Sequence, residues 1–176
     1  MIVCLGWGSL IWNPDTLKIK NGWQKNGPSI AVEYIRQSQD GRLTLVIDNS
    51  CHRQPVLWAE MTFEDCDEAK ENLKSREKTI DKYIGLWRRG DESPPTIPEI
   101  NKWADLVGAE SIIWTDLPPK FGGENFRSPS LAEAQQYLRS LNSERLALAK
   151  EYICNTPSQI QTPFRTQLEQ TLAELT

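Results

Sequence analysis

The stretch IVCLGWGSLIW, residues 2–12, decides the fold of this chain. An apolar run that ends in Gly-Trp-Gly predicts a buried strand at 2–7 that runs into a tight loop. Glycines permit positive φ angles and let successive backbone N–H groups point the same way, which is how a loop binds an anion or an oxyanion. The third glycine of the dinucleotide fingerprint is missing and no lysine follows, which excludes a Rossmann or P-loop interpretation. A plain tight turn is the alternative.

The rest of the sequence divides into a strand-rich first part and a helical last part. The expected strands are 29–38, 42–48, 55–62 and 111–115, with Asp40-Gly41 as a hairpin turn between the first two. The expected helices are 65–87, 97–107, 130–141, 143–154 and 157–175, with caps at Asp65, Ser130 and Ser143 and a loop at 116–128. Strands that precede helices in this way predict an α+β fold and not a doubly wound sheet.

Bulk composition restricts the class of protein. The chain has 176 residues, 39% hydrophobic and 25% charged, so we expect a single domain over residues 1–176. A net charge of -4 disfavours nucleic acid as a partner, because phosphate binding needs a basic face. No run reaches the ~18 apolar residues of a membrane span, and the N-terminus lacks the features of a secretory signal. We therefore expect a cytoplasmic protein with no membrane partner.

Cysteine and histidine are too sparse for the usual metal sites. The chain has one histidine and four cysteines, none of them in a C-x-x-C pair, so we expect free thiols and no bound metal. Cys51-His52 pairs a nucleophile with a base, but adjacent side chains in an extended loop point apart, so the geometry of such a dyad is poor. A thiol hydrolase that uses Cys51 remains an alternative, which inactivation by iodoacetamide with protection by substrate would favour.

Glu77 is the carboxylate whose position invites a chemical role. In the predicted helix 65–87 the apolar positions are Ala69, Leu73, Ile80, Ile84 and Trp87, and Glu77 fills the gap in that stripe. A buried carboxylate costs desolvation energy unless it is paired or used, and burial raises its pKa toward the range of a general base. The alternative is a Glu at the edge of the stripe that pairs with a neighbouring Arg or Lys.

Four blocks of the sequence resemble one family in its own order. GWGSLIW at 6–12 resembles the Gly-Tyr-Gly-Ser-Leu-Ile-Trp loop of the ChaC-type γ-glutamyl cyclotransferases. GRLTLV at 41–46 and VLWAE at 56–60 resemble the next two blocks, and LKSRE at 73–77 resembles the Leu-x-x-Arg-Glu block that carries the catalytic glutamate. The resemblance implies a small mixed β-barrel with flanking helices, with the barrel and active site in residues 1–128 and C-terminal helices in 129–176.

The resemblance also implies a reaction. The free α-amine of a γ-glutamyl amine or peptide attacks its own γ-carbonyl, which gives 5-oxoproline and a released amine. Glu77 would be the general acid/base, the loop residues Trp7, Gly8, Ser9, Leu10 and Ile11 would bind the substrate, and no metal or cofactor is implied. The tyrosine of the family's loop is Trp7 here, which removes a hydroxyl near the substrate. The principal alternative is a non-catalytic protein, for small-molecule binding or regulation, that keeps the fold and the pocket.

Overall fold

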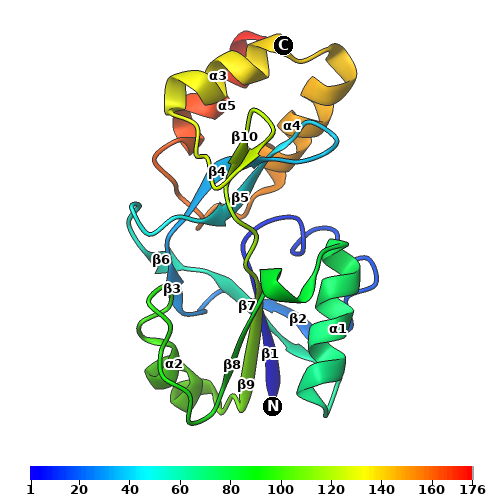
Figure 1. Cartoon of the computed structure of the whole chain (residues 1–176), viewed down its shortest axis with the longest axis vertical. Helices are drawn as coiled ribbons and strands as arrows, with labels where there is room; N and C mark the ends of the chain where they lie inside the picture. The colour runs from blue at the N-terminus through cyan, green and yellow to red at the C-terminus, as the bar shows by residue number, and fades with distance from the viewer. Residues whose placement is uncertain (176) are drawn as a thin grey trace.

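The computed structural model describes residues 1–175, which form five α-helices and three β-sheets (Figure 1). The strands are β1 Ile2–Gly6, β2 Ile19–Gln24, β3 Ser29–Ile30, β4 Val32–Gln37, β5 Leu43–Ile47, β6 Gln54–Pro55, β7 Leu57–Met61, β8 Ile84–Arg88, β9 Ser111–Thr115, β10 Lys120–Phe121 and β11 Glu124–Asn125. The helices are α1 Cys66–Glu77, α2 Ile100–Val107, α3 Leu131–Ser140, α4 Ser143–Asn155 and α5 Arg165–Glu174, with a short 3₁₀ helix at Asp81–Tyr83. The predicted α+β class is confirmed.

The first strand lies at the centre of the largest sheet, whose order is β2-β7-β1-β9-β8. β1 pairs antiparallel with β7 and parallel with β9. All five of its residues are buried because both faces of the sheet are covered. Ile2 and Cys4 join the core under α1, whereas Val3 and Leu5 join the larger core on the opposite face. Figure 1 shows α1 and α2 on opposite sides of this sheet.

The second sheet, β11-β10-β4-β5, carries the C-terminal helices. Its centre is the β4–β5 hairpin, and Gly41 in the turn has a φ of 90°, which glycine adopts at low cost. In Figure 1 this sheet and helices α3, α4 and α5 form the upper half of the molecule, and the five-stranded sheet forms the lower half. One core cluster runs from Val3 in the lower half to Leu138 and Leu168 in the C-terminal helices.

The strands of residues 1–175 do not close into a barrel, in contrast to the expectation from the family resemblance. The predicted strand 29–38 changes partner at Ala31: β3 pairs with β6, and β4 pairs with β5. The predicted strand 55–62 likewise divides at Val56, where β6 ends and β7 begins its pairing with β1. Because the chain changes sheet at these two points, its hydrogen bonds form three separate sheets.

The predicted helix 65–87 is wrong in its second half. Asp65 does cap the helix, through hydrogen bonds from the N–H groups of Asp67 and Glu68. The helix ends at Glu77, because Lys78 takes the left-handed conformation that closes a helix C-terminus. Residues 84–88 form β8, which pairs antiparallel with β9, and Ile80 is 54% exposed instead of facing the core.

Smaller differences also separate prediction from structure. Strand β2 was not predicted, since IKNGWQ is mostly polar and its central residues are exposed. The loop predicted at 116–128 contains the short β10–β11 hairpin, which turns at Gly122-Gly123 with positive φ at both.

The helices of the C-terminal part differ from the prediction at their first residues. Asn142, and not Ser143, caps α4. The last helix begins only at Arg165, whose buried guanidinium binds the carbonyls of the preceding connector. No helix within residues 1–175 is long and apolar enough to cross a membrane.

Candidate active site

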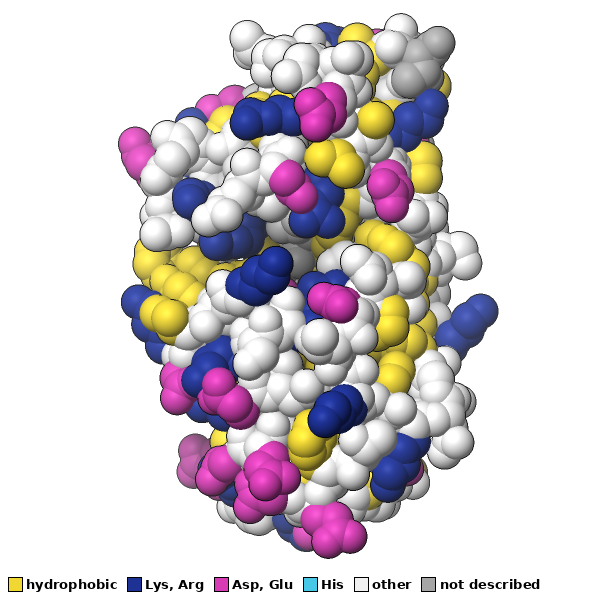
Figure 2. Space-filling model, turned by 90° about the vertical axis from the view of Figure 1, so that its right-hand side faces the viewer, with side chains coloured by type: hydrophobic (Ala, Val, Ile, Leu, Met, Phe, Trp, Pro, Cys, Tyr) yellow, Lys and Arg dark blue, Asp and Glu magenta, His cyan; other side chains and the backbone are white. Residues whose placement is uncertain are grey.

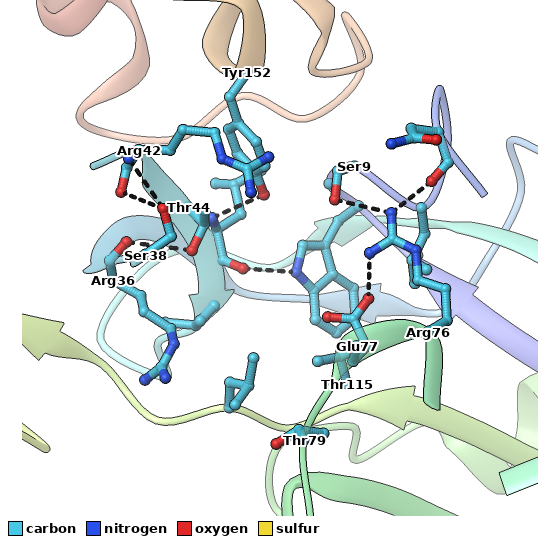
Figure 3. Close-up of a pocket in the computed structure, with 18 of the residues that line it drawn as sticks. Ser9, Arg36, Ser38, Arg42, Thr44, Arg76, Glu77, Thr79, Thr115 and Tyr152 are labelled. Carbon is cyan, nitrogen blue, oxygen red and sulfur yellow. Dashed lines mark hydrogen bonds and ion pairs between the residues drawn. The ribbon is translucent and has the colours of Figure 1, made fainter. Parts of the chain in front are cut away.

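A cavity of about 520 Å³ is lined by residues from both halves of the molecule. Its walls come from the loop after β1, the C-terminal end of α1, the β4–β5 hairpin, the segment after β9 and Tyr152 of α4. The volume is within the ~300–1,000 Å³ of small-molecule sites. In Figure 2 many Lys and Arg side chains gather around a hollow at mid-height, and Figure 3 shows the side chains that face the cavity.

The glycines of the first loop are needed for close packing and not for a positive φ angle. This corrects the expectation from the sequence that they adopt positive φ. Neither Gly6 nor Gly8 has a positive φ. A Cβ at Gly6 would overlap Trp23 and Ile11, and a Cβ at Gly8 would overlap the hydroxyl oxygen of Tyr152. Glycine is therefore needed here because the backbone runs against other side chains.

The same loop offers hydrogen-bond donors. Its turn is closed by the N–H of Ile11 on the carbonyl of Gly8, at 3.0 Å, and by the N–H of Asn13 on that of Ser9, at 2.8 Å. Within residues 1–175 the N–H groups of Gly8, Ser9 and Leu10 donate to no acceptor, and all three residues line the cavity. Consecutive unpaired N–H groups beside a cavity can bind a carboxylate or a developing oxyanion.

The other two predicted loop residues occupy different positions. Trp7 lines the cavity but is only 5% exposed, and its indole N–H donates to the carbonyl of Leu45 on β5 at 3.2 Å. Trp7 thus ties the loop to the β4–β5 hairpin. Ile11 is not among the cavity-lining residues and packs against the core.

Glu77 forms the part of the wall where α1 ends. Its side chain is 14% exposed and lines the same cavity as the glycine loop. Burial raises the pKa of Glu77, and the charges of Arg76 and Arg42 oppose that rise only in part. The guanidinium of Arg76 lies 3.1 Å from the carboxylate. Glu77 therefore combines the two interpretations of the sequence: it is a buried carboxylate, and it is paired with a neighbouring arginine.

Arg76 fixes the glycine loop to the end of α1. Besides Glu77, its guanidinium donates to the hydroxyl of Ser9 at 3.3 Å and to the carbonyl of Asn13 at 2.5 Å. The loop and the carboxylate are thus held by one side chain, as Figure 3 shows. Such a link keeps a base and a row of N–H donors at a constant separation.

Tyr152 brings a hydroxyl from the C-terminal part of the chain. It is 4% exposed, accepts the N–H of Leu45 at 3.2 Å and packs edge-on against Trp12. Burial raises the pKa of Tyr152 to about 12, so the phenol stays protonated at neutral pH. Among residues 1–175 its O–H has no acceptor, which leaves this proton for a ligand in the cavity.

The hairpin side of the cavity is rich in polar groups. Arg42 makes a two-point ion pair with Asp40, and its guanidinium carbon lies 5.6 Å from the ring centroid of Tyr152. The buried hydroxyl of Thr115 lines the cavity and has no hydrogen-bond partner within the described residues. An unpaired buried hydroxyl costs free energy unless a ligand or a water binds it.

Sequence reasoning missed several of these residues. Arg42 lies in one of the matched blocks, GRLTLV, and that match was a usable signal. Tyr152, Arg36 and Thr115 lie outside every matched block, in segments that contain no motif. Only the folding of the chain brings these three side chains to the cavity.

The Cys51-His52 pair lies outside this cavity. The thiol of Cys51 is 3.7 Å from a carboxylate oxygen of Asp48, and His52 is exposed. Burial and the charge of Asp48 raise the pKa of Cys51 to about 11, so the thiol is neutral at physiological pH. A nucleophilic cysteine requires the opposite environment.

No group of three or more His, Cys, Asp or Glu side chains in residues 1–175 is placed to hold a metal ion. That the protein works without a metal stays a prediction. No family model matches the chain, and the search of curated proteins finds no relative of it.

Proposed function

We propose that the protein is a γ-glutamyl cyclotransferase-like enzyme that releases 5-oxoproline from a γ-glutamyl amine or peptide. One observation carries the proposal: the buried carboxylate of Glu77 and the unpaired N–H groups of Gly8, Ser9 and Leu10 line the same cavity. A general base and an oxyanion site that face the same small cavity are the two requirements of an intramolecular acyl transfer. The cavity also has room for a dipeptide-sized substrate.

In this proposal Glu77 carries two protons, one after the other, from the attacking nitrogen to the leaving nitrogen. The carboxylate takes a proton from the α-ammonium of the substrate, and the free amine attacks the γ-carbonyl, so that a carbon–nitrogen bond closes the five-membered ring. As the bond to the leaving nitrogen breaks, that nitrogen receives the first proton from Glu77, and the regenerated carboxylate takes the second proton that the ring nitrogen loses, so that 5-oxoproline forms as a neutral lactam. Glu77 then passes this second proton to the released amine, which leaves as an ammonium ion. The raised pKa of Glu77 favours the steps in which the carboxylate accepts a proton, because a carboxylate with a raised pKa is a stronger base than an unperturbed one.

The negative charge that develops on the γ-carbonyl oxygen needs donors that are already in position. The N–H groups of Gly8, Ser9 and Leu10 would supply them, and the phenol of Tyr152 lies against Gly8 with an unused proton. Tyr152, which lies on α4, would thus supply the hydroxyl that is missing because Trp7 stands where the family's loop has a tyrosine. Donors fixed by the fold need no reorganisation during the reaction.

The family assignment is part of the same proposal. What supports it is that three of the matched blocks contribute to one cavity: the glycine loop, the GRLTLV strand with Arg42, and the end of α1 with Glu77. In this view the two larger sheets, which are not hydrogen-bonded to each other, correspond to the strands of the family's small mixed barrel. Superposition on an experimental structure of a family member would test this correspondence.

The experiment is a screen for 5-oxoproline release from γ-glutamyl amines, amino acids and peptides. Glu77→Gln keeps the size of the side chain but cannot accept a proton, so turnover should fall about 10²–10⁴-fold while substrate affinity is largely kept. Cys51→Ser is the matched control and should retain normal turnover, because the thiol lies outside the cavity. Near-normal turnover in Glu77→Gln, or an inactive but folded Cys51→Ser, would contradict the mechanism.

A non-catalytic binding protein is the second candidate, and the pairing of Arg76 with Glu77 favours it. A guanidinium 3.1 Å away stabilises the charged carboxylate and opposes the proton uptake that catalysis requires. The two candidates differ in the screen. A binding protein would bind γ-glutamyl compounds with a measurable Kd and release no 5-oxoproline from any of them.

A further inference from the structure

Arg36 is a half-buried cation in the cavity wall that has no acidic partner. It lies on β4, and one guanidinium nitrogen donates to the carbonyl of Pro118 at 2.8 Å. Within residues 1–175 no ion pair joins it to an Asp or a Glu. Most of the donor capacity of this side chain is therefore unused on the protein.

The other two arginines of the cavity differ in this respect. Arg42 is paired with Asp40, and Arg76 is paired with Glu77. Burial lowers the pKa of Arg36, a sign that desolvation of its charge is not offset by a neighbouring carboxylate. A partly desolvated arginine that has no acidic partner can bind an anionic ligand. A guanidinium binds a carboxylate through two parallel hydrogen bonds.

The position of Arg36 shows which part of a ligand it would meet. In Figure 3 Arg36 and Glu77 lie on opposite sides of the cavity, and the glycine loop is on the side of Glu77. The glutamyl half of a substrate must lie beside Glu77 and the loop if Glu77 is the base. The half that leaves then extends across the cavity toward β4 and Arg36.

We infer that Arg36 binds a carboxylate on the leaving half of the substrate, so that the protein acts on γ-glutamyl amino acids or peptides with a free C-terminal carboxylate and discriminates against neutral γ-glutamyl amides and amines. This inference rests on the proposed function. It assigns Arg36 as a specificity-determining residue. The carboxylate is the shared chemical feature of these substrates, whatever the side chain of the released residue.

The test compares γ-glutamyl-alanine with its C-terminal amide, which differ only in the charge that Arg36 would bind. A charge-assisted hydrogen bond contributes about 1.5–3 kcal/mol, so kcat/KM should favour the free acid by about 10–100-fold, mainly through KM. Arg36→Gln should bring this ratio close to one by lowering kcat/KM for the acid far more than for the amide. Arg36→Lys should keep part of the preference, because it retains the charge and loses the two-point geometry.

Arg139→Gln is the matched control, because it removes the same charge from an exposed ion pair on α3. It should leave the acid-to-amide ratio unchanged. Equal turnover of acid and amide by the wild type, or an unchanged ratio in Arg36→Gln, would overturn the role of Arg36 and leave the proposed function standing. If neither compound yields 5-oxoproline, the proposed function fails. The role of Arg36 is then judged by titrating both compounds, and equal affinities would overturn it.

Discussion

The α-carbon of Gly8 lies directly against the phenol of Tyr152, so that a Cβ at residue 8 would overlap the hydroxyl oxygen. The ring carbon that carries the hydroxyl would be 3.3 Å from the same Cβ. The contact joins the first loop of the chain to α4, and the same hydroxyl accepts the N–H of Leu45. Gly8 and Tyr152 together hold the loop, the hairpin and the C-terminal helix around the cavity.

Gly8→Ala should therefore damage the site although it adds one methyl group. The phenol cannot move without losing the hydrogen bond from Leu45, so either the loop or α4 must shift. Overpacking of this kind costs about 1–3 kcal/mol of unfolding free energy, and displacement of the loop should lower substrate affinity as well. Chemical denaturation and ligand titration measure the two effects separately.

A double-mutant cycle separates this contact from a general effect on the loop. Tyr152→Phe removes the overlapping oxygen and leaves the N–H of Leu45 unpaired, at a cost of about 1–3 kcal/mol. In the Tyr152→Phe background, Gly8→Ala should cost clearly less stability than in the wild type. Additive costs would show that the two residues do not interact.

The buried carboxylate of Glu77 should make stability depend on pH. Burial raises its pKa above the value of 4.5 that an unperturbed Glu has, so the native state binds a proton more tightly than the unfolded chain. From about pH 4.5 up to the raised pKa, the free energy of unfolding contributed by Glu77 falls as the pH rises. Glu77→Gln should reduce this slope and should equal or exceed the wild type in Tm at neutral pH.

Thermal unfolding between pH 4 and pH 8 measures this effect. Burial raises the pKa of Glu33 as well, so part of the same slope should persist in the variant. Glu64→Gln is the control, because it changes an exposed carboxylate. A Tm for Glu77→Gln well below that of the wild type at pH 7 would mean that the ion pair with Arg76 outweighs the desolvation of Glu77.

Gly85→Ala tests the strand that replaces the second half of the predicted helix. On β8 a Cβ at Gly85 would overlap the indole of Trp114, its partner on β9, so the substitution should cost about 1–3 kcal/mol or more. In a helix the same change would stabilise by about 1 kcal/mol, because alanine is the better helix former. The sign of the change in Tm therefore decides between strand and helix. Leu106→Ala, at a side chain 77% exposed, is the control and should change Tm little.

Turnover should not depend on a bound metal. The chain has one histidine and no C-x-x-C pair, and the proposed chemistry uses a carboxylate and backbone N–H groups. Dialysis against a chelator should leave 5-oxoproline release unchanged, and elemental analysis should find less than one metal ion per chain. Loss of activity that added zinc or iron restores would contradict this prediction.

The sequence by itself determined the elements that depend on neighbouring residues. The apolar run before Gly6 is a buried strand, Asp40-Gly41 turns a hairpin, and Asp65 and Ser130 cap helices. The strand is identified by its short apolar run that ends in glycine. For the turn and the caps the decisive interaction spans at most a few residues, so it can be identified without the rest of the chain. The sequence also singled out Glu77, which lines the cavity. The argument used for it was partly wrong, because the helix that was expected to reach Trp87 ends before Lys78.

Only the tertiary structure decided what lies beyond residue 77 and what lines the cavity. Ile80, Ile84 and Trp87 fit helical spacing, but Lys78 ends the helix and residues 84–88 gain a long-range partner in β9. Periodicity cannot separate these outcomes, because the hydrogen bonds of a strand are made to residues distant in sequence. Tyr152 and Arg36 reach the cavity for the same reason: packing of α4 and the hairpin against the first loop, and no local pattern, sets their positions.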